Sequence, residues 1–411
     1  MNAALQRKPL VAALQAIKRT ASHQGKLKTT AMRLVRVVPE ADHLRLVYNN
    51  AVSDLKISRR VPAAFSVEPE AFPSAGTPLA FDLEDMLRLT AHLPNDLALA
   101  ADESGNLRLV FENGEFHVPP VETAWLGQDW PHDDPPGTLE TDALASLLWE
   151  TYCFAAKDET RDAIGCVRLI RGMRGRVMAE ALDGHQYVNA SRPAPGLRKS
   201  LPEEGILIRR KFARQLAHLL GSGFFGEGVS LFPEWGEFKA DPTCVADTRS
   251  ERRQTGFILS GSLGRLAFSP APYQFPDTML FLEKSRGAPH VLTLDHAGAL
   301  RALRLMAPLT DQYNRSVTLS LTPSGVTFFT ETGFRGEYRM AADYEGELDS
   351  IAFPASVLRE VIASFPGSET VRMGFTSREG PCRICVPDHD REVVLMPMKM
   401  TADHYDGGRA S

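Results

Sequence analysis

The segment Ile208–Leu220, which reads IRRKFARQLAHLL, has apolar residues at its first, ninth and thirteenth positions. The segments Phe81–Leu93 (FDLEDMLRLTAHL) and Phe353–Phe365 (FPASVLREVIASF) have the same spacing, and each of the three is followed by proline or glycine. Apolar residues at these positions form one stripe along an α-helix, and the proline or glycine marks its end. The sequence therefore predicts three related helices, separated by roughly 130–150 residues, which is far more than the period of a solenoid.

A second set of predicted helices precedes the first set at similar offsets. These segments read KPLVAALQAIKRT from Lys8, TDALASLLWETYCFAAKDETR from Thr141 and DHAGALRALRLMA from Asp295. Each leads into alternating, β-branched runs, which begin at Leu44, Val167 and Ser316. The turn signals NN, RGMRG and PSG divide these runs into hairpins. The order helix, hairpins, helix, hairpins thus occurs three times along the chain.

This threefold order predicts an α+β fold built from three copies of one domain. The stretches WPHDDPPG (130–137) and EKSRGAPH (283–290) are polar and rich in turn residues, so we expect the domain boundaries there. The expected domains are residues 1–132, 133–286 and 287–400. The polar tail 401–411, which contains two consecutive glycines, is expected to be flexible.

The totals argue against several classes of protein, although the total charge argues only mildly against nucleic-acid binding, because it hides how the charge is distributed. The chain has 411 residues, too many for one compact core, and a net charge of −5, whereas freely soluble DNA-binding modules are usually basic. No apolar run approaches the roughly 20 residues that span a bilayer, and the start MNAALQRKPL lacks the apolar core of a signal peptide. The five scattered cysteines do not indicate a disulfide framework. We therefore expect a cytoplasmic protein that has no membrane association.

Four motifs, taken in order, carry a resemblance to a known family. They read EALDGHQYVNASRP (180–193), ILIRRKFARQLAHLL (206–220), YQFPDTMLFL (273–282) and VVLMPMKM (393–400). On the threefold repeat, these motifs make the chain resemble the β subunit of bacterial DNA polymerase III, the DNA sliding clamp. The resemblance implies a ring-forming homodimer of two head-to-tail subunits, with helices lining a central hole and no catalytic chemistry or cofactor.

The resemblance also implies what the ring does in DNA replication. A clamp loader places the ring around duplex DNA, and the ring then tethers the DNA polymerase III α subunit and other factors through their short peptide motifs. The implied function is therefore that of a non-enzymatic processivity factor. Since such a ring must slide, its contacts with phosphates should be numerous, weak and independent of base sequence.

The family's peptide cleft can be carried over position by position. It would be formed by the middle domain, the segment that enters the third domain, and the final strand: Ile164, Leu182, Gly184, His185, Gln186, Tyr187, Pro276, Leu280, Phe281, Val394, Leu395, Met396, Pro397, Met398, Lys399 and Met400. Methionines suit a groove that accepts several peptides, because their side chains repack at low cost. The alternative for VVLMPMKM is an ordinary buried strand, in which alternate residues face the core.

Basic residues on or beside the predicted helices are the expected DNA-facing residues. They are Lys18, Arg19, Lys157, Arg161, Arg209, Arg210, Lys211, Arg214, Arg301 and Arg304. For any single residue, plain solvation of a helix face is an equal alternative. In the family, an edge strand of the first domain pairs with one of the third, and the matching dimer-interface positions here are Phe116 and Pro308–Leu309.

The departures from the family keep other functions open. The first 35 residues match poorly, residues 221–260 hold an insertion, and eleven residues follow Met400. A diverged accessory clamp, or a clamp-like interaction scaffold that does not encircle DNA, is therefore an alternative. A small-molecule enzyme is a further alternative, but the sequence shows no convergent polar constellation.

Three short motifs imitate cofactor, metal or catalytic sites. GSGFFG at 221–226 matches G-x-G-x-x-G, but it follows a predicted helix, whereas a dinucleotide loop follows a strand. Cys382 and Cys385 form a lone C-x-x-C whose side chains face opposite sides of a strand. Asp183-Gly184-His185 has no nucleophile motif beside it. We therefore predict no catalytic, cofactor or metal site, and a turn supported by Gly184.

Overall fold

The structure is a computed structural model. It describes residues 2–22, 29–49, 55–66, 78–102, 104–126, 139–158, 161–238, 251–310, 315–330, 335–387 and 389–399. Of residues 30, 125, 235–238, 251–255 and 280–281, only the backbone is described. Met400 and the expected flexible tail 401–411 lie outside the described residues.

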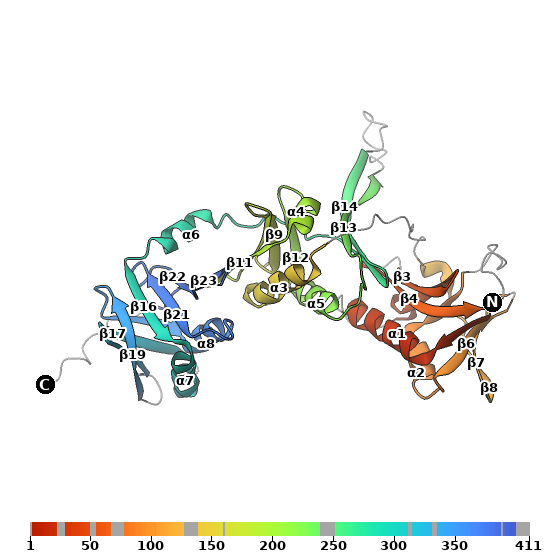
Figure 1. Ribbon diagram of the computed structural model, residues 1–411, viewed down its shortest axis with the longest axis horizontal. Coiled ribbons are helices and arrows are strands. Elements are labelled where there is room, and N and C mark those ends of the chain that lie inside the picture. Colours follow the sequence, from red (N-terminus) through yellow and green to blue (C-terminus); the bar gives the residue numbers. More distant parts are fainter. Residues whose placement is uncertain are drawn as a thin grey trace. The chain divides into compact units, whose positions relative to one another are not determined.

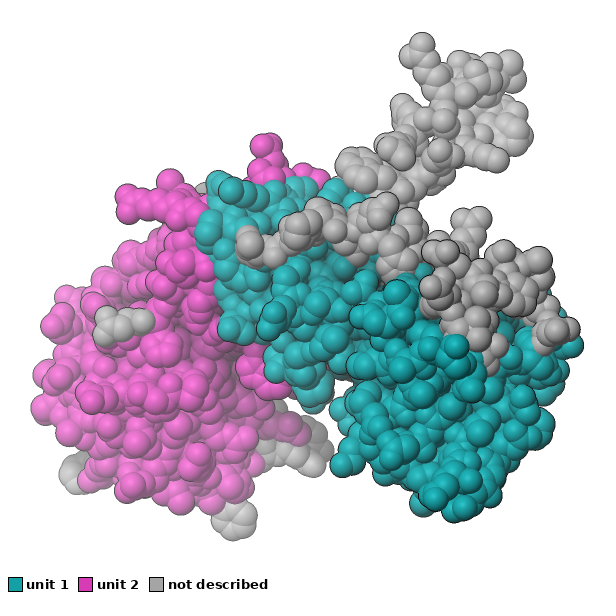
Figure 2. Space-filling model, turned by 45° about the vertical axis from the view of Figure 1, so that its right-hand side comes forward, with its two compact units in different colours: residues 1–145, 194–202, 214–270 teal, residues 146–193, 203–213, 271–411 magenta. Residues whose placement is uncertain are grey.

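The chain divides into two compact units, which Figure 2 distinguishes by colour. One unit consists of residues 1–145, 194–202 and 214–270, and the other of residues 146–193, 203–213 and 271–411. Among the described residues, an eleven-stranded antiparallel sheet belongs to the first unit and a twelve-stranded one to the second. The middle third of the chain contributes strands to both, so compactness alone does not separate the three expected domains.

The first third of the chain alternates two helices with two groups of strands. Its elements are β1 (Asn2–Gln6), α1 (Arg7–Ala21), the short helix η2 (Thr30–Met32), β2 (Leu34–Glu40), β3 (His43–Tyr48), β4 (Lys56–Phe65), β5 (Ala80–Asp82), α2 (Leu83–Thr90), β6 (Asp96–Ala101), β7 (Leu107–Phe111), β8 (Gly114–His117) and η4 (Thr123–Trp125). The strands pair in the order β5-β2-β3-β4-β1-β6-β7-β8, with every pair antiparallel.

The last third repeats this arrangement strand for strand. Its elements are β16 (His290–Asp295), α7 (His296–Met306), η6 (Ala307–Leu309), β17 (Ser316–Thr322), β18 (Gly325–Thr330), β19 (Gly336–Glu345), β20 (Ser350–Pro354), α8 (Ala355–Ala363), β21 (Thr370–Phe375), β22 (Cys382–Cys385) and β23 (Arg391–Leu395). Their order, β20-β17-β18-β19-β16-β21-β22-β23, is the order of the first third with each strand replaced by its counterpart.

The middle third follows the same order of elements. They are α3 (Thr141–Thr151), η5 (Tyr152–Phe154), β9 (Cys166–Arg171), β10 (Arg176–Leu182), β11 (Gln186–Pro193), α4 (Pro195–Ser200), β12 (Ile206–Arg209), α5 (Arg210–Gly221), β13 (Ser230–Phe238), β14 (Glu251–Ser260) and β15 (Gly264–Phe268), followed by α6 (Met279–Arg286). Strands pair as β12-β9-β10-β11 and as β13-β14-β15. The predicted α+β fold of three repeats is therefore confirmed, although the helix predicted from Thr141 to Arg161 ends at Thr151.

Neighbouring repeats are joined by strand pairing of one kind. The eighth strand of the middle repeat, β15, pairs with the fourth strand of the first repeat, β4, through Gly264↔Arg59, Arg265↔Ser58, Leu266↔Ile57 and Ala267↔Lys56. The eighth strand of the third repeat, β23, pairs with the fourth strand of the middle repeat, β11, through Gln186↔Leu395, Tyr187↔Val394, Val188↔Val393, Asn189↔Glu392 and Ala190↔Arg391. Both joints run antiparallel, and both make one continuous sheet from two repeats.

The helices lie in pairs against these sheets, α1 beside α2 and α7 beside α8 (Figure 1). The apolar stripe of α1 is buried at Leu10, Leu14 and Ile17, as its spacing predicts. Asp82 begins α2 by accepting hydrogen bonds from the backbone nitrogens of its first turn, and Asp295 does the same for α7. No described helix is long and apolar enough to cross a membrane.

Candidate functional site

A tight turn links two strands at one edge of the predicted cleft. The Oδ1 atom of Asp183 accepts hydrogen bonds from the backbone nitrogens of His185 and Gln186, both at 2.9 Å, and its Oδ2 atom accepts one from Gln186 Nε2 at 3.0 Å. Gly184 has φ +97°, a conformation that favours glycine. Arg161 Nη1 donates to the Asp183 carbonyl at 3.1 Å. The Asp-Gly-His sequence is thus a turn held by its own side chains, and His185 is exposed on it.

The final strand, β23, is buried, but the segment that follows it, beside this turn, is half-buried. Val394 and Leu395 are fully buried, and Tyr187, opposite Val394, is 2% exposed. Beyond them, Met396, Pro397 and Met398 are half-buried and Lys399 is exposed. The Met396 N–H donates to the His185 carbonyl at 2.9 Å. VVLMPMKM therefore has two parts: a core strand, which supports the predicted cleft, and a more exposed continuation, which can line it.

The remaining predicted cleft residues are distributed around this strand. Leu182 is half-buried and packs against Tyr187, Leu282 and Val394, and Ile164 is half-buried as well. Pro276 is exposed just before α6. Leu280 and Phe281 lie within α6, and only their backbone is described; Met400 is outside the described residues. The described members of the predicted cleft all belong to one compact unit.

A buried polar network under this region was missed by the sequence reasoning. The Tyr187 hydroxyl donates to Glu180 Oε1 at 2.7 Å, and Thr278 Oγ1 donates to the same oxygen at 3.4 Å. Arg168 Nη1 lies 3.5 Å from Glu180 Oε2. Burial and the neighbouring Glu180 carboxylate raise the pKa of Tyr187, so its hydroxyl stays protonated and remains a donor. The network joins β10 and β11 to the start of α6. The only sequence signal for it is the alternating pattern of β10.

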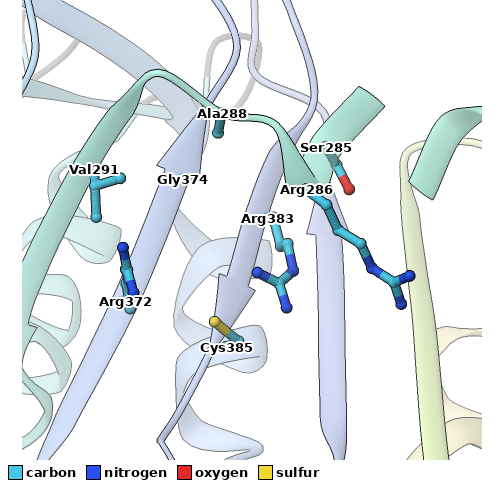
Figure 3. A pocket seen from close by; sticks show the side chains of 8 residues that line it. All are labelled: Ser285, Arg286, Ala288, Val291, Arg372, Gly374, Arg383 and Cys385. Carbon is cyan, nitrogen blue, oxygen red and sulfur yellow. The ribbon is translucent and has the colours of Figure 1, made fainter. Parts of the chain in front are cut away.

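A second ionic cluster holds α6 onto the sheet. Glu392, which is 8% exposed, accepts hydrogen bonds from Arg286 at the end of α6 and from Arg383 Nε of β22, the latter at 2.7 Å. Burial by itself would raise the pKa of Glu392, but the hydrogen bonds and charges of the two arginines outweigh burial and lower it. Figure 3 shows that Arg286, Arg372 and Arg383 line a hollow between α6, β16, β21 and β22. The hollow contains none of the predicted cleft residues.

The predicted DNA-facing residues differ in how available they are. Arg19, Lys157, Arg161, Arg209, Lys211, Arg214, Arg301 and Arg304 are exposed. Lys18 forms an ion pair with Glu84 at 2.7 Å across α1 and α2. Arg210 is half-buried, donates to the Tyr152 carbonyl at 3.2 Å, and lies over the Tyr152 ring. Arg210 therefore packs against η5, whereas Arg209 is exposed but donates to the Tyr273 hydroxyl at 3.2 Å and lies over the Tyr273 ring.

The predicted dimer-interface residues lie at or beside sheet edges. Phe116 is 42% exposed on β8, which pairs only with β7 among the described strands. The Phe111 and Phe116 rings meet edge to face, with centroids 5.3 Å apart. Pro308 is exposed and Leu309 half-buried in η6. Leu309 Cδ1 lies 2.5 Å from where a Cβ on Gly336 would be, so Leu309 packs onto the first residue of β19.

The motifs that imitate other sites are structural elements. Gly221 ends α5, and the GSGFFG segment leads into β13, so it does not have the strand-to-helix geometry of a dinucleotide loop. Cys382 is fully buried on β22 and Cys385 is half-buried. Within the described part of the chain, no cluster of His, Cys, Asp or Glu side chains could hold a metal ion.

Comparisons with known proteins agree with one class. No protein-family model matches the chain. The beta sliding clamp of Caulobacter vibrioides is 24% identical over 387 residues, which cover 91% of this chain and 94% of that protein. The solved Caulobacter crescentus beta sliding clamp has a TM-score of 0.76 at 21% identity, and the DNA polymerase III subunit beta from Pseudomonas aeruginosa has 0.75 at 19%, each over 97% of this chain and 100% of the other.

The fold and its repeated strand order are those of the solved DNA sliding clamps. Within that class, the chain is similar in sequence and in fold to the bacterial beta sliding clamps.

Proposed function

We propose that the chain is a non-enzymatic DNA sliding clamp that encircles duplex DNA as a head-to-tail homodimer and acts as a processivity factor. The single observation that carries this proposal is the joint between repeats. An eighth strand pairs with a fourth strand twice within the chain. Among the described strands, this leaves the outer edge of one eighth strand, β8, and one edge of the first half of a fourth strand, β19, for a second copy. The alternative, a scaffold that never encircles DNA, gives no reason for two complementary strand edges.

The internal joints predict the register of the joint between subunits. Within each repeat, the last residue of the third strand pairs with Ile57, Tyr187 and Gly336 respectively, so these three positions are equivalent. In the β7–β8 hairpin Phe111 pairs with Gly114, and in the β14–β15 hairpin the Gly261 N–H donates to the Gly264 carbonyl, so Gly114 is equivalent to Gly264 and Phe116 to Leu266. The two internal joints contain the pairs Ile57–Leu266 and Tyr187–Val394. The corresponding pair between subunits is Gly336–Phe116.

The side chains at these positions support this pairing. The two internal joints each combine two apolar side chains that are buried. In the proposed joint, Phe116 lies opposite a residue without a side chain, so its large ring has room over Gly336. Leu309 already packs beside Gly336 and provides an apolar surface for that ring. Burying Phe116 across one joint contributes on the order of 2–3 kcal/mol. This supports the roles predicted for Phe116 and for Pro308–Leu309.

We also propose that partner peptides bind along the half-buried end of the final strand. Met396, Pro397 and Met398 leave the core beside the His185 turn, and together they form a flexible apolar edge on a rigid support. The DNA polymerase III α subunit and the clamp loader are the partners we propose for it, through short motifs that have apolar anchors. A role on DNA also supports the cytoplasmic location expected from the sequence. The threefold strand order supports the three expected domains.

The proposed contact with DNA needs only the exposed basic residues of the helices and of the segments beside them. Such contacts are electrostatic and independent of base sequence, and they weaken as salt rises. Topology, and not affinity, would retain the ring on DNA. The negative net charge of the whole chain is compatible with this, because only the lining of the hole must be basic.

The experiment that tests the function compares circular with linear DNA. The protein is loaded onto nicked circular duplex by a bacterial clamp loader with ATP and then separated from free protein by gel filtration in moderate salt. We expect it to remain on circular DNA and to leave after a restriction enzyme linearises the circle. Equal retention on both forms, or a monomeric mass by light scattering at micromolar concentration, would contradict the proposal.

A further inference from the structure

One exposed aromatic residue occupies a helix position that is polar or basic in the other two repeats. Trp149 on α3 is 55% exposed, although Leu147 and Leu148 before it are fully buried. Its ring meets that of Tyr152, with centroids 5.5 Å apart and an angle of 52° between the planes. An exposed indole offers a large flat face to a ligand, and its N–H can donate a hydrogen bond.

The internal repeat identifies the surface on which Trp149 lies. In α1, α3 and α7, a buried residue is followed three and four positions later by two more: Leu10, Ala13 and Leu14; Leu144, Leu147 and Leu148; Ala299, Ala302 and Leu303. The next residue is exposed in α1 and α7, where it is Gln15 and Arg304. Trp149 is therefore the counterpart of Arg304, a predicted DNA-facing residue. On the proposed function, the same helix position faces the DNA in every repeat.

The Tyr152 ring, which meets Trp149, also contacts a basic residue. The Arg210 guanidinium carbon lies 6.0 Å from the centre of the Tyr152 ring, and Arg210 Nε donates to the Tyr152 carbonyl at 3.2 Å. Lys211, the next residue, and Lys157, beyond η5, are both exposed. Glu150, the nearest acidic residue on α3, forms an ion pair with Arg192. Aromatic faces flanked by cations are the combination that binds single-stranded nucleic acid, by stacking on bases and attracting phosphates.

We propose that Trp149, supported by Tyr152 and Arg210, is a stacking site for an unpaired nucleobase of single-stranded DNA. The proposal rests on the proposed function, because it assigns Trp149 to the face that meets DNA. Bases within a duplex already stack on each other, so only an unpaired base can offer a free face to the indole. Since every base has such a face, binding should show little dependence on sequence. The site would bind the single-stranded side of a junction between single-stranded and duplex DNA.

The test measures single-strand and duplex binding separately. Binding of fluorescently labelled oligothymidine and of a duplex of equal length is followed by anisotropy at low salt. For Trp149→Ala we expect single-strand affinity to fall roughly five- to hundredfold, and for Trp149→Phe to remain near that of the unchanged protein. Duplex affinity should not change. The matched control is Leu305→Ala, because Leu305 is an exposed apolar residue on α7, 52% exposed, and follows Arg304; it should alter neither affinity.

Two results would overturn the proposal. One is unchanged single-strand affinity in Trp149→Ala, and the other is an equal loss on single-strand and duplex DNA, which would indicate a general surface effect or a different partner. Trp149→Ala should also be retained on circular duplex like the unchanged protein. If the unchanged protein is not retained on circles but the single-strand effect of Trp149 persists, the clamp function fails while the stacking site stands.

Discussion

At the scale of single residues, Met398 distinguishes two roles for the end of the chain: a surface that contacts peptides, or part of the core. Its side chain is half-buried, and its N–H donates to the Ala352 carbonyl at 2.8 Å. The backbone is thus held in place by a bond that the side chain does not make. A methionine on a fixed backbone can change rotamer without moving the strand, which suits a surface that must fit several peptides.

We predict that Met398→Ala weakens partner peptides more than it weakens the fold. Truncation removes several methylene-sized groups from the contact, so peptide affinity should fall about five- to thirtyfold, or ~1–2 kcal/mol. Isothermal titration with a peptide that carries apolar anchors measures the affinity, and calorimetry measures the melting temperature. A lowered melting temperature with unchanged peptide affinity would show that Met398 belongs to the core.

Glu392 is the residue on which the attachment of α6 depends. We predict that Glu392→Gln lowers the free energy of unfolding by about 1–2 kcal/mol at neutral pH, a modest figure because Arg286 and Arg383 are partly exposed. The measurement is urea denaturation followed by circular dichroism. The control is Glu345→Gln on β19, because Glu345 is exposed, and it should cost much less.

The stability that Glu392 contributes should depend on pH in a direction that its pKa shift fixes. The pKa of Glu392 is lower in the folded protein than its ordinary value. Its contribution to stability is therefore fully present above the ordinary glutamate pKa of about 4.3, and it is lost as the pH falls through the lower folded pKa. The stability difference between the unchanged protein and Glu392→Gln should be constant from pH 6 to 8 and should shrink below roughly pH 4.5. A difference that grows on acidification would contradict this assignment.

At the scale of elements, the sequence predicted the repeated helices better than the joints between repeats. The stripe of IRRKFARQLAHLL is enough to place α5, because helix periodicity is a local property. The network of Glu180, Tyr187 and Thr278 joins residues that are up to 98 positions apart, and no local pattern reports such a contact. For the same reason, VVLMPMKM showed apolar character but not the change from buried Leu395 to half-buried Met396.

Registers between strands were also beyond the sequence. From the resemblance, Phe116 was predicted to meet Pro308–Leu309 across the joint, but Gly336, the residue that we propose lies opposite it, was not predicted, since Gly336 carries no side chain that a pattern could reveal. The proposed partner comes from comparing three repeats in one structure. The sequence predicted an insertion at residues 221–260 but no structure for it. This range contains the β13–β14 hairpin, whose register shifts between Glu234 and Trp235.

We predict that the edge strand β8 depends on Phe116 for pairing with a second copy. Phe116→Ala removes ~2–3 kcal/mol of burial from each joint, and a closed ring has two joints, so the dimer dissociation constant should rise by at least about a hundredfold. Analytical ultracentrifugation across a dilution series measures this constant. Leu263→Ala is the matched control, because Leu263 is 40% exposed at the turn of the equivalent hairpin, yet belongs to a joint already made within the chain. Equal effects of both substitutions would argue against the proposed joint.

At the scale of the whole molecule, two joints between subunits must form before a ring can close. Next to Phe116 and Gly336, the proposed register places Glu115 opposite Glu337. Each carboxylate has its own arginine: Arg108 lies 2.9 Å from Glu115, and Arg339 lies 2.8 Å from Glu337. The two acidic side chains are thus neutralised locally, so the joint tolerates a like-charge pair that would otherwise be unfavourable.

The register can be tested by covalent closure of the ring. In a background where Cys153 and Cys244 are serine, we predict that Glu115→Cys with Glu337→Cys forms a disulfide-linked dimer under mild oxidation. Residues directly opposite in an antiparallel pair have Cα atoms about 4.5–5.5 Å apart, which a disulfide can span. Glu115→Cys with Arg339→Cys is the control, because a two-residue shift keeps the same face of the sheet but moves the pair about 7–8 Å apart. Oxidised rings, once loaded, should stay on circular DNA in salt that releases uncrosslinked ones, and reducing agent should free them. Preferential crosslinking of the shifted pair would disprove the register, while crosslinking without retention would show a dimer that does not encircle DNA.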